Sequence, residues 1–322
     1  MCRKMNCVVL LGMLLVSTAF AQPATYPTKP IRWLIPFAAG GGTDVIARPL
    51  VQKLSERMGQ SIIYENRGGA GGVVAGEIVA RATPDGYTLL VAAVAVMTVT
   101  VSLVDKMPFD PVKDFTPITK FANVPNILVA RPGFAPRTLK EIVDYARASP
   151  GKLIWASSGT GSAGMLTMEL FRLNNGLNMV HVPYKGAGPA TTGVLTNEAD
   201  LLFANPGVFM GHIKAGRLRP VVSCSSARLS ILPDVPTVAE MGFPGYENGS
   251  WYGLAAPART PAPIIKRLHD DIVTVLKDPE IIAGFTRDGA QAVGNTPEAF
   301  AQEIRDDIVK WAKVIKAANV KI

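Results

Sequence analysis

The feature that most constrains the fold is a glycine turn between an apolar segment and a helix start, in residues 31–48 (IRWLIPFAAGGGTDVIAR). The apolar segment predicts a strand, and the helix is expected to begin at Thr43 or Asp44. Consecutive glycines permit backbone angles that other residues resist, so several amide N–H groups can converge on one point. The first N–H groups of a helix have no intrahelical partner and lie at the positive end of its dipole. This unit therefore predicts a cradle for an anion.

A second unit with the same design occupies residues 153–173 (LIWASSGTGSAGMLTMELFRL), about 120 residues further along the chain. Strand-like and helix-like periodicity alternate through the rest of the sequence, with helices expected at 44–58, 139–148 and 163–173. Such alternation predicts mainly parallel sheets with right-handed crossovers. Two cradles of this kind suggest a ligand held between two α/β lobes.

Two extended stretches mark the expected crossings between these lobes. Residues 107–130 are punctuated by prolines and then run extended, and residues 249–256 (GSWYGLAA) run extended again before the last helices. We therefore expect lobe 1 to comprise residues 22–120 and 253–322, and lobe 2 to comprise residues 121–252.

The N-terminus has the organisation of a secretory signal peptide. Arg3 and Lys4 are followed by an apolar run at residues 8–16 and by an A-x-A cleavage pattern that ends at Ala21. The apolar run is shorter than the roughly 20 residues needed to span a bilayer. We expect cleavage before Gln22, which makes residues 1–21 the signal peptide and the mature protein an exported, periplasmic one.

Composition excludes several classes of protein. Cleavage of the signal peptide leaves Cys224 as the only cysteine, so no disulfide framework is expected. The net charge of +8 comes from basic residues that are scattered among acidic ones, which gives nucleic-acid binding little support. His181, His212 and His269 lie far apart in the sequence without the spacing of metal ligands, so no metal is expected.

Two motifs point toward enzymes only weakly. Residues 159–164 match G-x-G-x-x-G after a strand, but no acidic residue follows about 20 positions later, as a dinucleotide site requires. Ser162 resembles a nucleophile elbow, although Thr160 replaces the first glycine of that motif and no histidine is evidently placed to activate the serine. We therefore expect neither a cofactor nor an enzymatic activity, with an exported hydrolase that uses Ser162 as a remote alternative.

Nearly all of the mature sequence resembles the substrate-binding proteins of tripartite tricarboxylate transporters, the TctC/Bug family. Long segments carry the resemblance: YPTKPIRWLIPFAAGGGTDVIAR, ENRGGAGGVVAGEIVARATPDGYTLL, FDPVKDFTPIT, SPGKLIWASSGTGS, HVPYKGAGPA, HIKAGRLRPVV, LPDVPTVAEMGFPGYE and KWAKVIKAANV. The resemblance implies a two-lobed periplasmic binding protein of the type II class that closes on a small carboxylate. It also implies that backbone amides and ordered waters, rather than a charged clamp, hold the carboxylate. Lys185 is then expected to stabilise its loop rather than to contact the ligand.

Three positions depart from the family pattern. Met97 and Met165 stand where many members have a histidine, and Ala204, followed by Asn205, stands where many have an aspartate. One interpretation is neutral drift at the rim of the pocket. The other is a pocket with one anionic end and an apolar, thioether-lined body, which fits an aromatic or branched aliphatic acid.

These arguments predict a solute-binding protein, expected to be a monomer, that delivers a small carboxylate to the membrane permease of a tripartite transporter. A protein that presents its ligand to a periplasmic sensor would have the same fold and site, so this alternative stays open. The expected ligand-binding residues are Ala38, Ala39, Gly40, Gly41, Thr43, Asp44, Ala93, Met97, Ser158, Thr160, Gly161, Ser162, Met165, Tyr184, Ala204 and Asn205.

Overall fold

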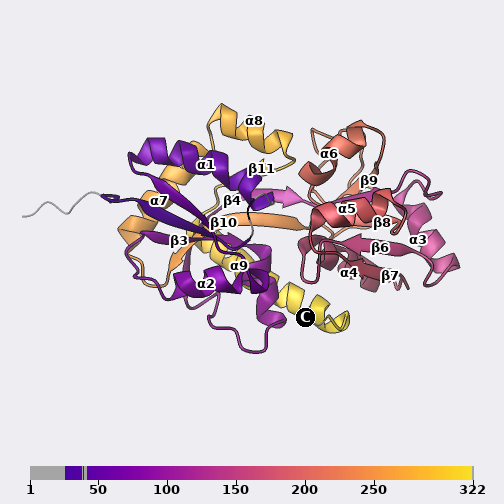
Figure 1. Cartoon of the computed structure of the whole chain (residues 1–322), viewed down its shortest axis with the longest axis horizontal. Coiled ribbons are helices and arrows are strands. Elements are labelled where there is room, and N and C mark those ends of the chain that lie inside the picture. Colours follow the sequence, from indigo (N-terminus) through magenta and orange to yellow (C-terminus); the bar gives the residue numbers. More distant parts are fainter. Residues whose placement is uncertain (1–25, 38, 40–41, 321–322) are drawn as a thin grey trace, which may run out of the picture.

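The computed structural model describes residues 26–37, 39 and 42–320. The expected signal peptide therefore lies outside the described residues, as do Ala38, Gly40 and Gly41. The described chain forms two α/β lobes that lie side by side along the long axis of the molecule (Figure 1). Within this part of the chain, no helix combines the length and the apolar character needed to cross a membrane.

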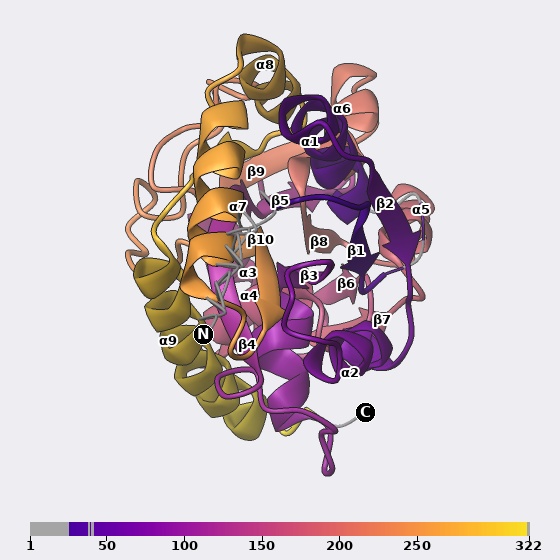
Figure 2. The same ribbon diagram turned by 90° about the vertical axis from the view of Figure 1, so that its left-hand side faces the viewer.

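The first lobe is built on a six-stranded sheet with the strand order β11-β4-β10-β3-β1-β2. Its strands are β1 (Ile31–Ile35), β2 (Ile62–Asn66), β3 (Thr88–Ala93), β4 (Phe115–Pro125), β10 (Gly249–Pro257) and β11 (Gln291–Ala292). Helices cover both faces, with α1, α7 and α8 on one side and α2 and α9 on the other (Figures 1 and 2). Their bounds are α1 (Gly42–Met58), α2 (Val73–Ala80), α7 (Ala262–Val275), α8 (Pro279–Arg287) and α9 (Pro297–Ala317).

The second lobe is built on a five-stranded sheet with the order β7-β6-β8-β5-β9. Its strands are β5 (Ile127–Ala130), β6 (Ile154–Ser157), β7 (Val180–Pro183), β8 (Leu201–Ala204) and β9 (Arg219–Ser223). Alternate side chains of a strand point to opposite faces. Accordingly, Leu128 joins the core that includes α3, and Val129 joins the separate core under α5 and α6. The helices are α3 (Leu139–Ala148), α4 (Ala163–Asn174), α5 (Ala187–Leu195) and α6 (Pro206–Lys214).

The expectation of mainly parallel sheets needs a correction, because both sheets are mixed. In the first lobe, β1 pairs in parallel with β2 and β3, whereas β10 runs antiparallel to β3 and β4. In the second lobe, β5 runs antiparallel to both β8 and β9. The strands that carry the chain from one lobe to the other cause the difference, since β4, β5 and β10 do not belong to strand–helix–strand units.

The two lobes are joined where β4 continues into β5 and where the chain returns into β10. At this junction the Asn126 amide donates to the Asn248 carbonyl (3.1 Å), and the Cys224 amide donates to the Asn126 carbonyl (2.8 Å). The expected lobe limits at 120/121 and 252/253 fall inside β4 and β10, which both belong to the sheet of the first lobe. The pairing of β4 with β10 thus extends the first sheet up to the crossing itself.

Candidate ligand-binding cleft

A cavity of about 930 Å³ lies between the lobes, a volume near the upper end for small-molecule sites. Residues of both lobes line it. The first lobe contributes Phe37, Ala39, Gly42, Thr43, Ala70, Gly71, Ala93, Val94, Ala95, Val99, Thr100, Leu103, Val104, Ser250 and Tyr252. The second lobe contributes Ser158, Thr160, Gly161, Ser162, Ala163, Gly164, Lys185, Gly186, Ala187, Pro189, Ala204, Asn205 and Val208.

The start of α1 forms the cavity wall in the first lobe. Gly42 and Thr43, the first two residues of α1, line the cavity, and the amides of a first helical turn have no intrahelical partner. Asp44 is only 4% exposed and is not among the lining residues. Its carboxylate accepts hydrogen bonds from the Tyr64 hydroxyl (2.7 Å) and the Asn66 amide (3.1 Å), which ties α1 to the end of β2.

The turn between β6 and α4 forms the facing wall in the second lobe. Gly159 and Gly161 have φ values of 125° and 77°, which only glycine adopts without strain. The Ser157 hydroxyl accepts the Gly159 amide (3.2 Å), and the Ser162 hydroxyl caps α4 by accepting the Met165 amide (3.3 Å). These bonds fix the shape of the turn, and residues 160–162 of it line the cavity.

Two further helix starts, which the sequence-based prediction did not assign to the site as such, also reach the cavity. α5 begins after Gly186 and α6 begins after Asn205, and both of these preceding residues line the cavity. Within the described part of the chain, neither helix start is capped by the side chain of its own N-cap residue. The side chain of Asn205 instead bonds to the first lobe. Its Nδ2 donates to the Val124 carbonyl (3.4 Å), and its Oδ1 accepts from the Ser250 hydroxyl (3.3 Å).

The cavity is electrostatically suited to an anion. The N-terminal ends of α1, α4, α5 and α6 all reach it, and each carries partial positive charge. Among the described lining residues no side chain is acidic, and Lys185 is the single charged one. Burial raises the pKa of the Tyr252 hydroxyl above its usual value, so this group stays protonated and can donate a hydrogen bond.

The body of the cavity is apolar, but its apolar side chains are not the expected ones. Met97 is fully buried, Met165 is 3% exposed, and neither lines the cavity. The larger apolar side chains come instead from the segment after β1, from the segment after β3, which adopts π-helical and 3₁₀ turns, and from α5 and α6. They are Phe37, Val94, Val99, Leu103, Val104, Pro189 and Val208. The two walls approach closely, since a methyl group built on Gly161 would lie 3.1 Å from Leu103 Cδ1.

The structure thus brings most of the sequence-predicted residues to one cavity and leaves others away from it. Tyr184 is turned away, because its hydroxyl donates to Glu198 (2.9 Å) and packs against Gly193. Lys185 makes no hydrogen bond or ion pair among the described residues, so its expected role in stabilising the loop has no contact to support it. The predicted residues that line the cavity are Ala39, Thr43, Ala93, Ser158, Thr160, Gly161, Ser162, Ala204 and Asn205.

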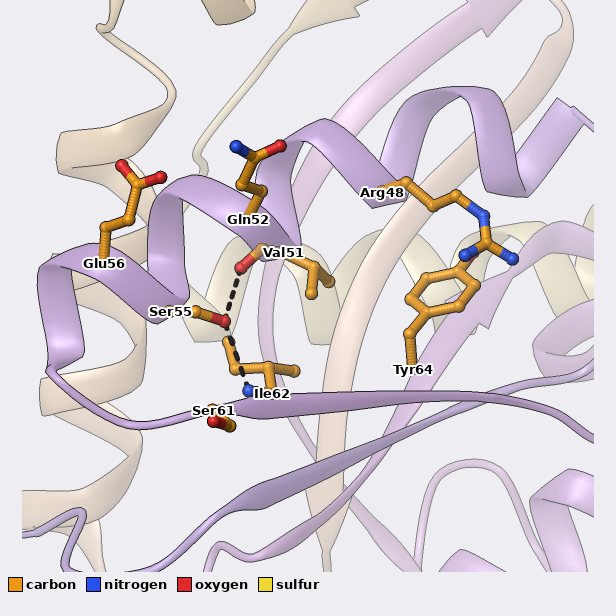
Figure 3. Close-up of a pocket in the computed structure, with 8 residues that line it drawn as sticks. All are labelled: Arg48, Val51, Gln52, Ser55, Glu56, Ser61, Ile62 and Tyr64. Atoms are coloured by element: carbon orange, nitrogen blue, oxygen red, sulfur yellow. Dashed lines mark hydrogen bonds between the residues drawn. The ribbon is translucent and has the colours of Figure 1, made fainter.

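Two other hollows are smaller, and several of their lining side chains are engaged with one another. A groove of about 440 Å³ between α1 and β2 places the guanidinium of Arg48 over the ring of Tyr64, and the Ser55 hydroxyl bridges the helix and the strand (Figure 3). A polar hollow of about 310 Å³ on the α9 side of the crossings holds Lys120, whose ammonium group is 2.5 Å from the carboxylate of Glu303. The interlobe cavity is therefore the strongest candidate site.

The histidines lie away from this cavity. His181 stacks on Trp155 (centroids 3.9 Å apart), and its Nε2 is 2.8 Å from the Ser157 hydroxyl. None of the three histidines lines the cavity, and no group of three or more potential metal-ligating side chains occurs among the residues that the structure describes. The Ser162 hydroxyl is engaged as the cap of α4, where it accepts the Met165 amide.

Two α/β lobes, two crossing strands and a cavity between the lobes define a two-lobed solute-binding protein. The sequence profile of the tripartite tricarboxylate transporter family receptor, TctC, matches residues 46–320. The chain belongs to this family.

Individual relatives agree with this assignment. The protein BugT of Bordetella pertussis is 34% identical over 319 residues, which cover 98% of each chain. The solved structure of R. palustris Rpa4515 with adipate matches with a TM-score of 0.82 and 33% identity, and covers 92% of this chain and 99% of its own. MatC (Rpa3494) from Rhodopseudomonas palustris with bound malate matches with a TM-score of 0.78 and 32% identity, and covers 90% of this chain and all of its own.

Proposed function

We propose that this protein binds a small carboxylate in the cleft between its lobes and delivers it to the membrane permease of a tripartite tricarboxylate-type transporter. The observation that carries the proposal is the convergence of four helix N-termini on a cavity whose described lining contains no acidic side chain. Backbone amides at helix starts bind carboxylates through hydrogen bonds and through the helix dipole. The carboxylate is therefore held mainly by the turn before α4 and by the start of α1.

The apolar lining supports an acid with an apolar body. Val99, Leu103 and Val208 offer no hydrogen-bonding group to hydroxyl or amino substituents along the ligand. A polar group buried there without a partner loses about 1–3 kcal/mol, or one to two decades of affinity. Citrate and glutamate should bind weakly, whereas an aliphatic or aromatic acid should bind more tightly. The adipate and malate held by the two related proteins support a small organic acid as the class of ligand.

The remaining parts of the proposal concern closure, location and assembly. The lobes close by a hinge at the crossings, near residues 116–124 and 250–255, as is general for two-lobed binding proteins. The signal-peptide pattern in the sequence and the receptor family both support a periplasmic location for the mature monomer.

Isothermal titration calorimetry with hexanoate, benzoate, adipate, citrate and glutamate tests this function, with hexanamide as the neutral partner of hexanoate. We expect an apolar-bodied acid to bind and its neutral amide to bind at least tenfold more weakly. A thermal-shift assay gives a second readout, because a ligand at 100 times its dissociation constant stabilises the native state by about 2.7 kcal/mol. Equal affinity for the acid and the amide would contradict an anion site, and turnover of ester substrates that is lost in Ser162→Ala would favour the hydrolase.

A further inference from the structure

We propose that Lys185 is a specificity-determining residue that favours ligands with a second anionic group over monocarboxylates. This inference rests on the proposed function, because it assigns a role within the same cleft. The first carboxylate is held by backbone amides, and the ammonium group of Lys185 contacts a second acidic group at the far end of an apolar ligand.

Lys185 lines the cleft from the short connection between β7 and α5. Tyr184 and Lys185 follow β7 in succession, and Lys185 lies in the bend that leads into α5. The Tyr184 side chain is fixed on the side away from the cleft by its bond to Glu198 (2.9 Å). Lys185, by contrast, is among the residues that line the cavity.

The base of the Lys185 side chain is firmly held. The Tyr184 amide donates to the Ser157 carbonyl (3.0 Å), and the Gly186 amide donates to the Ser158 carbonyl (3.1 Å). These two bonds pin the Lys185 backbone beside the turn that forms the anion cradle. A flexible side chain on a fixed base can reach the far end of a ligand whose first carboxylate lies in that cradle.

The charge of Lys185 is not used elsewhere in the described structure. Other lysines near the lobe junction are engaged, as Lys120 is with Glu303. For Lys185, the described residues provide neither an ion pair nor a side-chain hydrogen bond. No acidic side chain in the described lining of the cavity competes for it. An incoming anion therefore meets an unpaired cation that is already exposed on the cavity wall.

The test compares two acids of the same chain length, adipate and hexanoate, by calorimetric titration at low and high salt. The variants are Lys185→Gln, Lys185→Arg and, as a control for net charge, Lys152→Gln, which alters an exposed lysine of the same lobe outside the cavity lining. We expect Lys185→Gln to weaken adipate about two- to fivefold, the upper part of the range for an exposed ion pair. Hexanoate affinity should stay unchanged, Lys185→Arg should retain most adipate affinity, and Lys152→Gln should alter neither acid.

The preference of the wild type for adipate should also shrink as salt is raised, because salt screens an exposed charge pair. An equal loss for both acids in Lys185→Gln, or no loss for either, would overturn the assignment. If neither acid, nor any other in the panel, binds the wild type, the proposed function fails and this inference fails with it. Hexanoate binding without a Lys185-dependent gain for adipate would refute only the role of Lys185.

Discussion

Replacing Gly161 by alanine tests whether the turn before α4 forms the carboxylate cradle. Gly161 has a φ of 77°, and its added methyl group would lie 3.1 Å from Leu103 Cδ1 on the opposite wall. An L-residue in the left-handed region costs about 1–2 kcal/mol. Gly176→Ala is the matched control, because Gly176 has a φ of 61° but no atom within 4 Å of an added methyl group.

The two variants should lose similar stability but differ in binding. Chemical denaturation should show a loss of about 1–2 kcal/mol for each, since both incur the same backbone strain. Relief of that strain in Gly161→Ala turns amides away from the ligand, and a lost hydrogen bond to a charged group costs about 1.5–3 kcal/mol. We therefore expect calorimetry to show carboxylate affinity reduced at least tenfold in Gly161→Ala and unchanged in Gly176→Ala.

A folded Gly161→Ala protein that binds the acid as tightly as the wild type would refute this reasoning, because the turn would then not be the cradle. An equal loss of affinity in both variants would also contradict it, since the effect would follow stability rather than the site.

Arg48→Ala should leave carboxylate affinity within threefold of the wild-type value in a calorimetric titration, because Arg48 lies in the α1–β2 groove and not in the cleft; a tenfold loss would indicate a cationic clamp. Gly164→Ala should lower the free energy of unfolding by about 1–3 kcal/mol, because its methyl group would lie 2.0 Å from the carbonyl oxygen of Phe203. Gly211→Ala should raise it by about 0.5–1 kcal/mol, because Gly211 lies inside α6 and its added methyl group would meet no atom within 4 Å. Denaturant unfolding measures both changes. Burial and the guanidinium of Arg172 lower the pKa of His181 to about 4 from its usual 6.5. Because the unfolded chain then binds this proton more readily than the folded one, the free energy of unfolding should be constant above pH 6.5 and decrease as the pH falls toward 4. Denaturation across this range should show a smaller decrease for His181→Gln, and an unchanged slope would refute the burial argument.

Local signals made much of the fold predictable. The helix expected at residues 139–148 is α3, because Thr138 caps its first turn and apolar residues recur on one face. The strands and helices of the two strand–turn–helix units were predictable for the same reason, because their signals lie in neighbouring residues; Gly40 and Gly41 of the first turn lie outside the described residues. The antiparallel pairing of β4, β5 and β10 was not, because it depends on how the chain passes between lobes rather than on local periodicity.

The lining of the cleft was less predictable than the cradles. Met97 and Met165 were expected to line the pocket, but their side chains pack into the core. Tyr184 and Lys185 are adjacent, and only the contact of Tyr184 with Glu198 shows which one faces the cleft. Side chains alternate within a strand, but Lys185 lies in a bend beyond the end of β7, so no periodicity in the sequence gave the direction of its side chain.

The measurement that tests the central claim most directly is small-angle X-ray scattering of the protein, free and saturated with the acid that titrates most tightly. If a carboxylate bridges the cleft, the two lobes close at the crossings and the radius of gyration decreases on binding. Hexanamide at the same concentration should leave the scattering curve unchanged. Identical curves for the free and the acid-saturated protein would contradict capture of the ligand by closure of the two lobes.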